Sequence, residues 1–165
     1  MNIRKLNTHE KPPMDLLLLA DPSIRLVEDY VKRGHCYVAE EDTHPIGVYV
    51  LLPTRPDTIE LVNVAVSENL HGQGYGKQLV NHAIGQAQEL GYATIEVGTG
   101  STGVAQLALY QKCGFRMTGI DRDFFVRHYD EEIYENGMLL RDMVRLSLDL
   151  QGLGLGRCTI PPSDE

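Results

Sequence analysis

Three glycines stand at alternate positions in "HGQGYGKQLV", residues 71–80, where an amphipathic helix is predicted to begin. Glycine tolerates a positive φ and has no side chain to block a close approach, so a glycine-rich strand-to-helix turn can direct several backbone N–H groups at one anion. The positive end of the helix dipole strengthens that field. Gly72, Gly74 and Gly76 therefore predict a phosphate site, unless they serve only the geometry of the turn.

The spacing of these glycines excludes two common phosphate-binding motifs. The P-loop needs GxxxxGK followed by Ser or Thr, but here the glycines are one residue too close and glutamine follows the lysine. A literal GxGxxG occurs instead in "GTGSTG", at Gly98, Gly100 and Gly103, with Asp121 about 20 residues further on. This pattern leaves a dinucleotide-binding protein as an alternative. Against it, the remaining residues predict antiparallel strands rather than further parallel units.

The elements around these motifs follow from hydrophobic periodicity and from glycine and proline positions. In chain order they are a strand at 2–6, helices at 12–20 and 22–34, a hairpin of strands at 35–41 and 45–53, a β-rich run at 57–70, a helix at 76–90, a strand at 92–98, a helix at 104–114, and strands at 115–129 and 138–150. This order predicts an α/β (α+β) fold, with a mixed, mostly antiparallel central sheet flanked by helices.

Composition limits the classes of function. The 165 residues, 42% hydrophobic, suit a single domain over 1–150, and the Gly- and Pro-containing stretch 151–165 predicts a flexible tail. A formal charge of −8 argues against nucleic-acid binding, and it fits either a cationic substrate or simple solubility. Three scattered cysteines and the lack of an HxxxH pair indicate no metal site. The apolar run 14–20 is too short to span a membrane, so we expect a cytoplasmic protein.

Two segments together resemble the GNAT superfamily of N-acetyltransferases. "VNVAVSENLHGQGYGKQLV" is similar to that family's core motif, a strand followed by Gln/Arg-x-x-Gly-x-Gly/Ala and a helix, and "LALYQKCGF" is similar to its second signature. The resemblance implies acetyl-CoA as cosubstrate. Its pyrophosphate would lie on the turn, and its pantetheine arm would pair with the preceding strand like an added β-strand, beside a β-bulge. The implied contacts are Val64, Ala65, Val66, His71, Gly72, Gln73, Gly74, Tyr75, Gly76, Lys77 and Tyr110.

The sequence departs from the family pattern at two positions. His71 stands where the family has Gln or Arg, and Ser101 or Thr102 stands where many relatives have an Asn that contacts the cofactor. Histidine donates a hydrogen bond but carries a full positive charge only when protonated. These two contacts are therefore expected to differ from those of relatives.

Acetyl transfer to an amine needs a base, because an ammonium has no lone pair, and a proton donor for the departing thiolate. Glu60 and Glu96 are candidate bases because each interrupts an apolar strand, although exposure at a strand end also explains Glu60. The resemblance makes Tyr110 the proton donor. Cys113 leaves open a covalent acyl-cysteine, although a buried packing residue explains it as well.

The predicted function is transfer of an acetyl group from acetyl-CoA to a primary amine, in a small molecule or a peptide, by direct attack in a ternary complex. A non-catalytic acyl-CoA sensor is the alternative of a different class. The loop at 124–137 lies where the family often builds its acceptor site, which would place Tyr129, Glu131, Glu132 and Tyr134 near a cation. A solvated loop or a dimer contact explains that loop equally well, so the sequence leaves a homodimer open.

Overall fold

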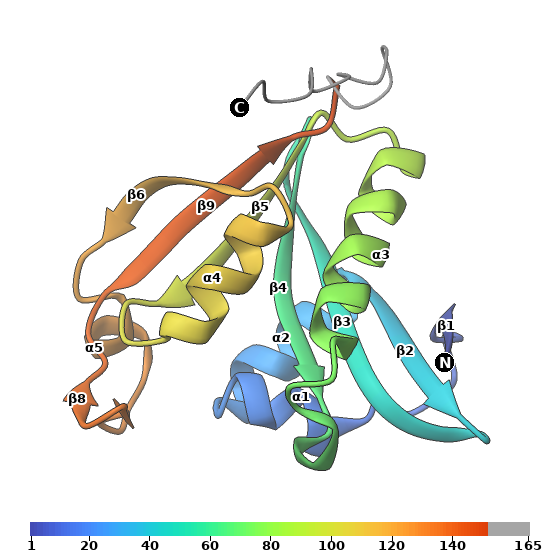
Figure 1. The fold of residues 1–165 in the computed structure, drawn as a ribbon, viewed down its shortest axis with the longest axis horizontal. Helices are drawn as coiled ribbons and strands as arrows, with labels where there is room; N and C mark the ends of the chain where they lie inside the picture. The colour runs from blue at the N-terminus through green and yellow to red at the C-terminus, as the bar shows by residue number, and fades with distance from the viewer. Residues whose placement is uncertain (152–165) are drawn as a thin grey trace, which may run out of the picture.

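A seven-stranded mixed sheet organises the chain in the computed structural model, which describes residues 1–151. Within these residues the strand order is β1-β2-β3-β4-β5-β9-β6, and only the β4–β5 pair is parallel. The strands are β1 Asn2–Lys5, β2 His35–Glu41, β3 His44–Arg55, β4 Thr58–Val66, β5 Thr94–Gly100, β6 Arg116–Asp121 and β9 Met143–Asp149. The predicted fold class is confirmed (Figure 1).

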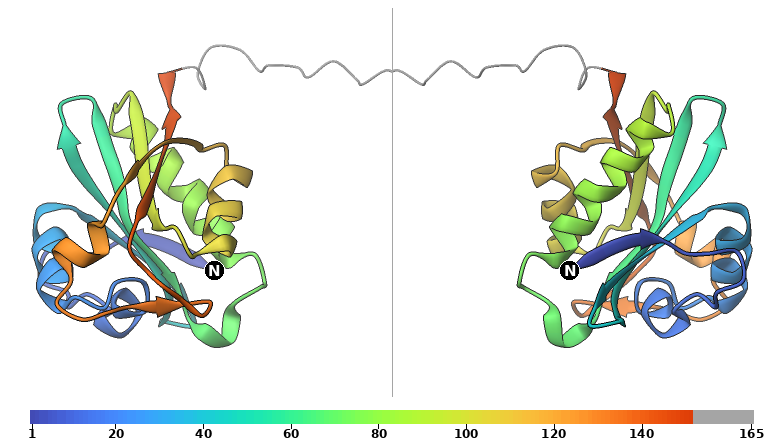
Figure 2. Two further views of the ribbon diagram at one scale, coloured as in Figure 1. Left: turned by 90° about the vertical axis from the view of Figure 1, so that its left-hand side faces the viewer. Right: turned by 90° about the vertical axis from the view of Figure 1, so that its right-hand side faces the viewer.

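Helices cover both faces of this sheet. They are α1 Met14–Ala20, α2 Ile24–Arg33, the 3-10 turn η1 Glu68–Leu70, α3 Tyr75–Glu89, α4 Val104–Lys112 and α5 Phe124–His128. Figure 2 shows α3 and α4 on one face and α1, α2 and α5 on the other. Ser23 caps α2 by accepting a hydrogen bond from the Leu26 N–H, as expected for a helix that opens at Pro22-Ser23.

Successive side chains of a strand point to opposite faces of the sheet, so apolar residues of the same strands form one hydrophobic core on each face. On the α3 side, Ile59 and Leu61 of β4 pack with Leu79 and Ala83, which share one face of α3. On the α1 side, Val48 and Val50 of β3 pack with other apolar residues, namely Leu16, Leu17, Val27 and Tyr30. The sheet is therefore buried on both faces along β3 and β4, which holds the central strands rigidly.

The strands β4 and β5 separate about halfway along β4. Their parallel pairing runs only from Thr58–Thr94 to Leu61–Val97, although β4 continues to Val66. The two strands lie together at the top of Figure 1 and diverge toward the bottom. At the same level the β3–β4 register shifts so that Val62 has no partner, which is the expected β-bulge. An opening in the sheet therefore begins one residue after Leu61.

The segment after Phe115 differs most from the prediction. The strand predicted over 115–129 is wrong in its second half, because β6 ends at Asp121 and the short helix α5 follows. The strand predicted over 138–150 is divided into β8 Met138–Leu139, which pairs with β7 Tyr134–Glu135, and β9. Apart from Gln151, the tail predicted to be flexible lies outside the described residues.

None of the helices within residues 1–151 is long and apolar enough to cross a membrane. In the same part of the chain, no three His, Cys, Asp or Glu side chains group as metal ligands would.

Candidate active site

The turn at residues 71–76 leaves the start of α3 without a side-chain cap. Gly72 has φ 78° and Gly74, the N-cap, has φ 87°, which is a left-handed conformation that favours glycine. The first N–H groups of a helix lack intrahelical partners. Since no side chain caps α3, the N–H groups of Tyr75, Gly76 and Lys77 can bind an external acceptor at the positive end of a helix of 15 residues.

The side chains of the turn bond to the protein itself. The His71 Nε2 donates to the Val66 carbonyl over 2.8 Å, and this bond joins the turn to the end of β4. The Tyr75 hydroxyl donates to Glu41, and the Gln73 amide donates to the Asn69 carbonyl. The backbone of the turn is therefore the part available to a ligand, as the sequence predicts, and His71 takes a structural bond here.

Beyond the bulge, β4 presents an unpaired edge to the opening. The Ser67 N–H donates to the Ile46 carbonyl over 2.8 Å, so Ile46 and Ser67 form a hydrogen-bonded pair of the β3–β4 ladder. Hydrogen-bonded and non-hydrogen-bonded residue pairs alternate along an antiparallel ladder. The N–H and C=O of Ala65 therefore point toward β3, whereas those of Val64 and Val66 point away from it. Of the three strand residues named from the sequence, Val64 and Val66 therefore direct backbone groups into the opening, and Ala65 does not.

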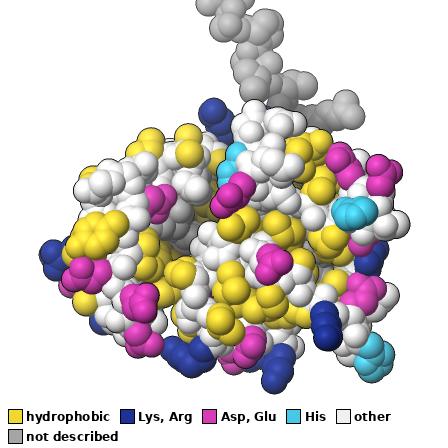
Figure 3. All heavy atoms as spheres, turned by 90° about the horizontal axis from the view of Figure 1, so that it is seen from below, with side chains coloured by type: hydrophobic (Ala, Val, Ile, Leu, Met, Phe, Trp, Pro, Cys, Tyr) yellow, Lys and Arg dark blue, Asp and Glu magenta, His cyan; other side chains and the backbone are white. Residues whose placement is uncertain are grey.

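The two features suit the acetyl-CoA implied by the sequence. An extended amide chain can pair with the free edge of β4, and phosphates can lie on the uncapped N–H groups at the start of α3. Both lie at the lower end of the molecule in Figure 1. Seen from below, the surface is hollowed over the region where β4 and β5 diverge, with apolar side chains around the hollow (Figure 3).

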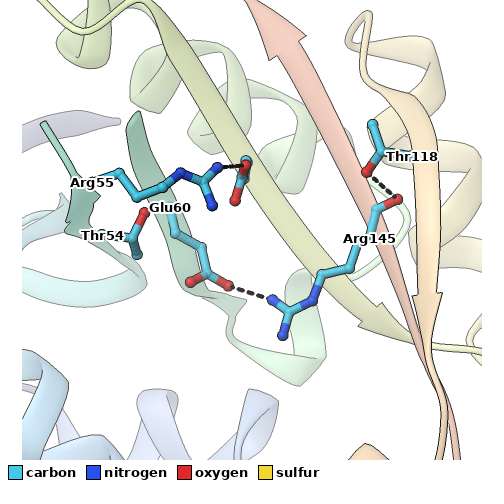
Figure 4. A pocket seen from close by; sticks show the side chains of 6 residues that line it. Thr54, Arg55, Glu60, Thr118 and Arg145 are labelled. Atoms are coloured by element: carbon cyan, nitrogen blue, oxygen red, sulfur yellow. Dashed lines mark hydrogen bonds and ion pairs between the residues drawn. The ribbon is translucent and has the colours of Figure 1, made fainter. Parts of the chain in front are cut away.

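The two predicted carboxylates meet on the face of the sheet opposite α3 and α4. Glu60 and Glu96 are register partners on β4 and β5, directly before the opening. They line a cavity of about 390 Å³ together with Thr54, Arg55, Thr118 and Arg145 (Figure 4). Arg145 donates to Glu60 over 3.2 Å, and Arg55 pairs with Glu96. The structure therefore brings both candidate bases together and gives each its own arginine.

Glu60 is the more buried of the two carboxylates, with a side chain 20% exposed against 27% for Glu96. Burial raises the pKa of Glu60 above its usual range, while the positive charge of Arg145 opposes that rise. A carboxylate in this position accepts a proton more readily than one in water.

Tyr110 belongs to α4, and its side chain points into the core on the α3 and α4 face of the sheet. Its ring packs edge-on against Phe115 at 6.0 Å, and burial raises the pKa of its phenol to about 12. Among residues 1–151 its hydroxyl has no hydrogen-bond partner, yet the oxygen is not fully sealed from solvent. The Leu109 side chain lies 3.6 Å from where a Cβ on Gly76 would be, so α4 runs beside the glycine turn.

The second glycine-rich stretch does not form a phosphate loop. Gly98 and Gly100 lie within β5 and pair with Arg145 and Met143 of β9, and neither has a positive φ. The dinucleotide alternative is therefore wrong in its structural premise, because the strand continues through the first two glycines of the motif. Ser101 follows directly, with an N–H bonded to the Asp142 carbonyl and an exposed side chain, so its hydroxyl is accessible to a ligand whereas its N–H is not.

The predicted acceptor loop borders a second cavity of about 520 Å³. Its lining includes the start of α2 and the four predicted residues: Pro22, Ser23, Arg25, His128, Tyr129, Asp130, Glu131, Glu132, Ile133 and Tyr134. The Tyr129 hydroxyl donates to Asp21 over 2.9 Å, and this carboxylate also accepts from Tyr30. The Asn63 amide of β4 donates to Tyr30, so a chain of hydrogen bonds joins this loop to the edge of the opening.

The sequence interpretation missed Asn63 and Arg145. Each is a polar residue inside an alternating apolar strand, "ELVNVAV" and "MVRLSLDL", which is the signal that identified Glu60 and Glu96. Applied evenly, the same criterion would have selected both. Their partners depend on strand register, which the pattern does not give.

Comparison with known proteins supports the same assignment. Residues 3–115 match the Acetyltransferase (GNAT) family. An uncharacterized N-acetyltransferase of Bacillus subtilis, YvbK, is 61% identical over 136 residues, which is 82% of this chain and 88% of that protein.

Two solved structures extend the comparison to the ligand. A Bacillus subtilis acetyltransferase in complex with CoA is 56% identical with a TM-score of 0.84, over 89% of this chain and 97% of that one. A GNAT family acetyltransferase from Elizabethkingia anophelis with acetyl-CoA bound is 41% identical with a TM-score of 0.88, over 90% and 97% of the two chains. The chain belongs to the GNAT family, and it is an acetyltransferase that uses acetyl-CoA as its cosubstrate.

Proposed function

We propose that this enzyme acetylates a primary amine by direct attack within a ternary complex, with Glu60 as base and Tyr110 as proton donor. The observation that carries the proposal is the separation of β4 and β5 directly after their paired carboxylates, with the partly buried Glu60 on one face of the sheet and the buried phenol of Tyr110 on the other face. Acetyl-CoA, when bound, supplies an activated acyl group as a thioester. The chain's own groups must then orient the amine, remove its proton and donate a proton on the opposite side.

Two backbone regions would hold the cosubstrate. The uncapped N–H groups of Tyr75, Gly76 and Lys77 are suited to the pyrophosphate. At the free edge of β4, the backbone groups of Val64 and the N–H of Val66, whose carbonyl accepts from His71, are suited to the amides of the pantetheine arm. A backbone N–H of this edge would also polarise the thioester carbonyl. Both regions are preformed in the fold, so they require little reorganisation on binding.

Glu60 is proposed as the base rather than Glu96. Both carboxylates lie directly before the last paired residues, Leu61 and Val97, so position does not separate them. The raised pKa of Glu60 makes it the better proton acceptor, while Arg145 keeps it ionised. The sign of the pH dependence follows: activity is lost as the pH falls through the pKa of Glu60, because the protonated acid cannot accept a proton. Glu96, which is paired with the exposed Arg55, would contribute charge only.

Tyr110 is proposed as the proton donor because its phenol stays protonated at neutral pH. Its raised pKa of about 12 follows from burial, and its free hydroxyl can donate to a departing thiolate. Cys113 is a poor candidate for a covalent intermediate, because burial raises the pKa of its thiol and so reduces the thiolate that would attack. Direct transfer is therefore favoured over an acyl-cysteine.

The test follows free thiol while the protein and acetyl-CoA are mixed with polyamines, amino acids, aminoglycosides or peptides with free N-termini. Thiol release should appear with at least one amine. Tyr110→Phe should reduce kcat at least tenfold, and Glu60→Gln by roughly 10²–10⁴-fold, whereas the control Glu96→Gln should have a smaller effect.

Three results would contradict the proposal. Tight CoA binding without release across the panel would favour a sensor. Wild-type rates in Tyr110→Phe or in Glu60→Gln would remove the role assigned to that residue.

The YvbK relative is named an N-acetyltransferase, which supports an amine acceptor. Its class, small molecule or peptide, and a cytoplasmic location stay predictions of the sequence, which leaves the oligomeric state open.

A further inference from the structure

Arg145 reaches Glu60 from two strands away. It lies on β9 opposite Gly98 of β5, and β5 in turn separates β9 from β4. The arginine side chain nevertheless brings its Nη1 to 3.2 Å from the Glu60 Oε1 (Figure 4). The contact joins two strands that are not neighbours in the sheet, so the strand order alone would not predict it.

The guanidinium of Arg145 is held by more than Glu60. Its Nη2 lies 3.4 Å from the Asp121 Oδ2 at the end of β6, and its Cζ lies 5.4 Å from the centroid of the Phe124 ring in α5. The fork geometry of arginine suits simultaneous contact with two carboxylates, and the ring adds a cation–π contact. Residues of β6 and α5 therefore fix the guanidinium charge that faces Glu60.

The neighbouring pair provides a contrast. Arg55 contacts Glu96 from a side chain that is 62% exposed, whereas the side chain of Arg145 is 33% exposed. An exposed pair is screened by solvent and contributes little. Of these two arginines, Arg145 is the one that combines partial burial with several anchoring contacts.

We propose that Arg145 is a positioning residue of the acetyl-transfer reaction, which holds the Glu60 carboxylate ionised and oriented at the start of the β4–β5 opening. The inference rests on the proposed function, in which Glu60 is the base. Asp121 and Phe124 act one step further out by fixing Arg145. Nothing in this role requires Arg145 to touch the substrate.

The charged groups that face Glu60 determine what the loss of Arg145 does. Burial and the nearby carboxylate of Glu96 both raise the pKa of Glu60, and they are opposed by Arg145 and, more weakly, by Arg55. Without Arg145 the pKa of Glu60 rises further, so Glu60 is protonated at a higher pH and stops accepting protons there. The acid limb of the pH–rate profile must therefore move upward.

The test is the pH profile of kcat/KM for acetyl transfer in wild type, Arg145→Gln, Arg145→Lys and the matched control Arg55→Gln. Arg145→Gln should shift the acid limb upward by about one pH unit, the low end of the effect of a nearby opposite charge. Since protonation of Glu60 is tenfold per pH unit, activity on that limb should fall about tenfold. Arg145→Lys should restore most of the shift, and Arg55→Gln should produce a smaller one.

Asp121→Asn provides a second route that leaves Arg145 in place and tests the proposal if Arg145→Gln does not fold. It loosens the anchor of Arg145, so it should shift the limb in the same direction by a smaller amount. A uniform loss of rate at every pH in Arg145→Gln, without a shift of the limb, would overturn the positioning role, as would an unshifted limb in Asp121→Asn if only that variant folds. Failure of the proposed function would look different, because Glu60→Gln would then keep its activity and its acid limb.

Discussion

Two glycine-rich stretches of this chain are similar in sequence but differ in backbone conformation and in packing. In residues 71–76, Gly72 and Gly74 take positive φ values, and a Cβ added to either would meet no atom within 4 Å. In residues 98–103 the first two glycines are extended, and a Cβ there would lie 2.5 Å from the Met143 sulfur or 2.6 Å from a Leu140 methyl carbon. The first stretch needs the conformation that glycine allows, and the second needs the absence of a side chain.

The contrast explains why a motif alone cannot locate a phosphate site. "GTGSTG" matches the dinucleotide pattern letter for letter, but its first two residues are paired in β5. "HGQGYG" fails that pattern and yet builds an uncapped helix start next to a free strand edge. What distinguishes them is whether backbone N–H groups remain unpaired, which depends on where the strand ends.

Gly98→Val tests the packing half of this contrast and should have the largest effect. The new side chain must displace Met143, so the free energy of unfolding should fall by about 1–3 kcal/mol in chemical denaturation. Met143→Ala in the same chain should recover part of the loss. The control is Gly119→Val on β6, where a Cβ meets nothing within 4 Å and stability should barely change. Equal losses at the two positions would refute the packing explanation.

Gly74→Val tests the conformational half, with a smaller expected effect. A left-handed backbone strains a residue with a Cβ by roughly 1–2 kcal/mol, so either stability falls by that amount or the turn rearranges and CoA binds about tenfold more weakly or worse. Gly74→Asn should be milder because asparagine tolerates this region. Calorimetric titration with CoA, together with thermal unfolding, measures both. Wild-type stability and affinity in Gly74→Val would show that the positive φ is unimportant.

Much of the fold could be predicted from local pattern. The α3 helix and the β2–β3 hairpin follow from apolar spacing and a polar turn, because those signals lie within a few residues of one another. The helix α5 was missed because its apolar residues also suit a strand, and at five residues it is too short to show helical periodicity. Whether these five residues form a helix or a strand depends on their tertiary contacts, which the local pattern does not give.

The site divides in the same way. Residues of the glycine turn could be chosen from sequence because one contiguous stretch builds that part of the site. The contact between Arg145 and Glu60 could not, because it joins residues 85 positions apart and depends on strand order and register. The backbone direction of Ala65 likewise depended on the phase of the β3–β4 ladder, which no residue type reveals.

The most direct test of the central claim, that the backbone at the start of α3 holds the phosphates, is a calorimetric titration of Gly76→Val with CoA. Gly76 is helical, without a positive φ, and a Cβ there makes an ordinary 3.6 Å contact with Leu109, so the fold should be kept. Gly85→Val on the same helix is the matched control, because a Cβ there meets nothing within 4 Å. We expect CoA to bind about tenfold more weakly to Gly76→Val, a loss of about 1.4 kcal/mol, and normally to Gly85→Val. Equal affinity in the two variants would contradict the account.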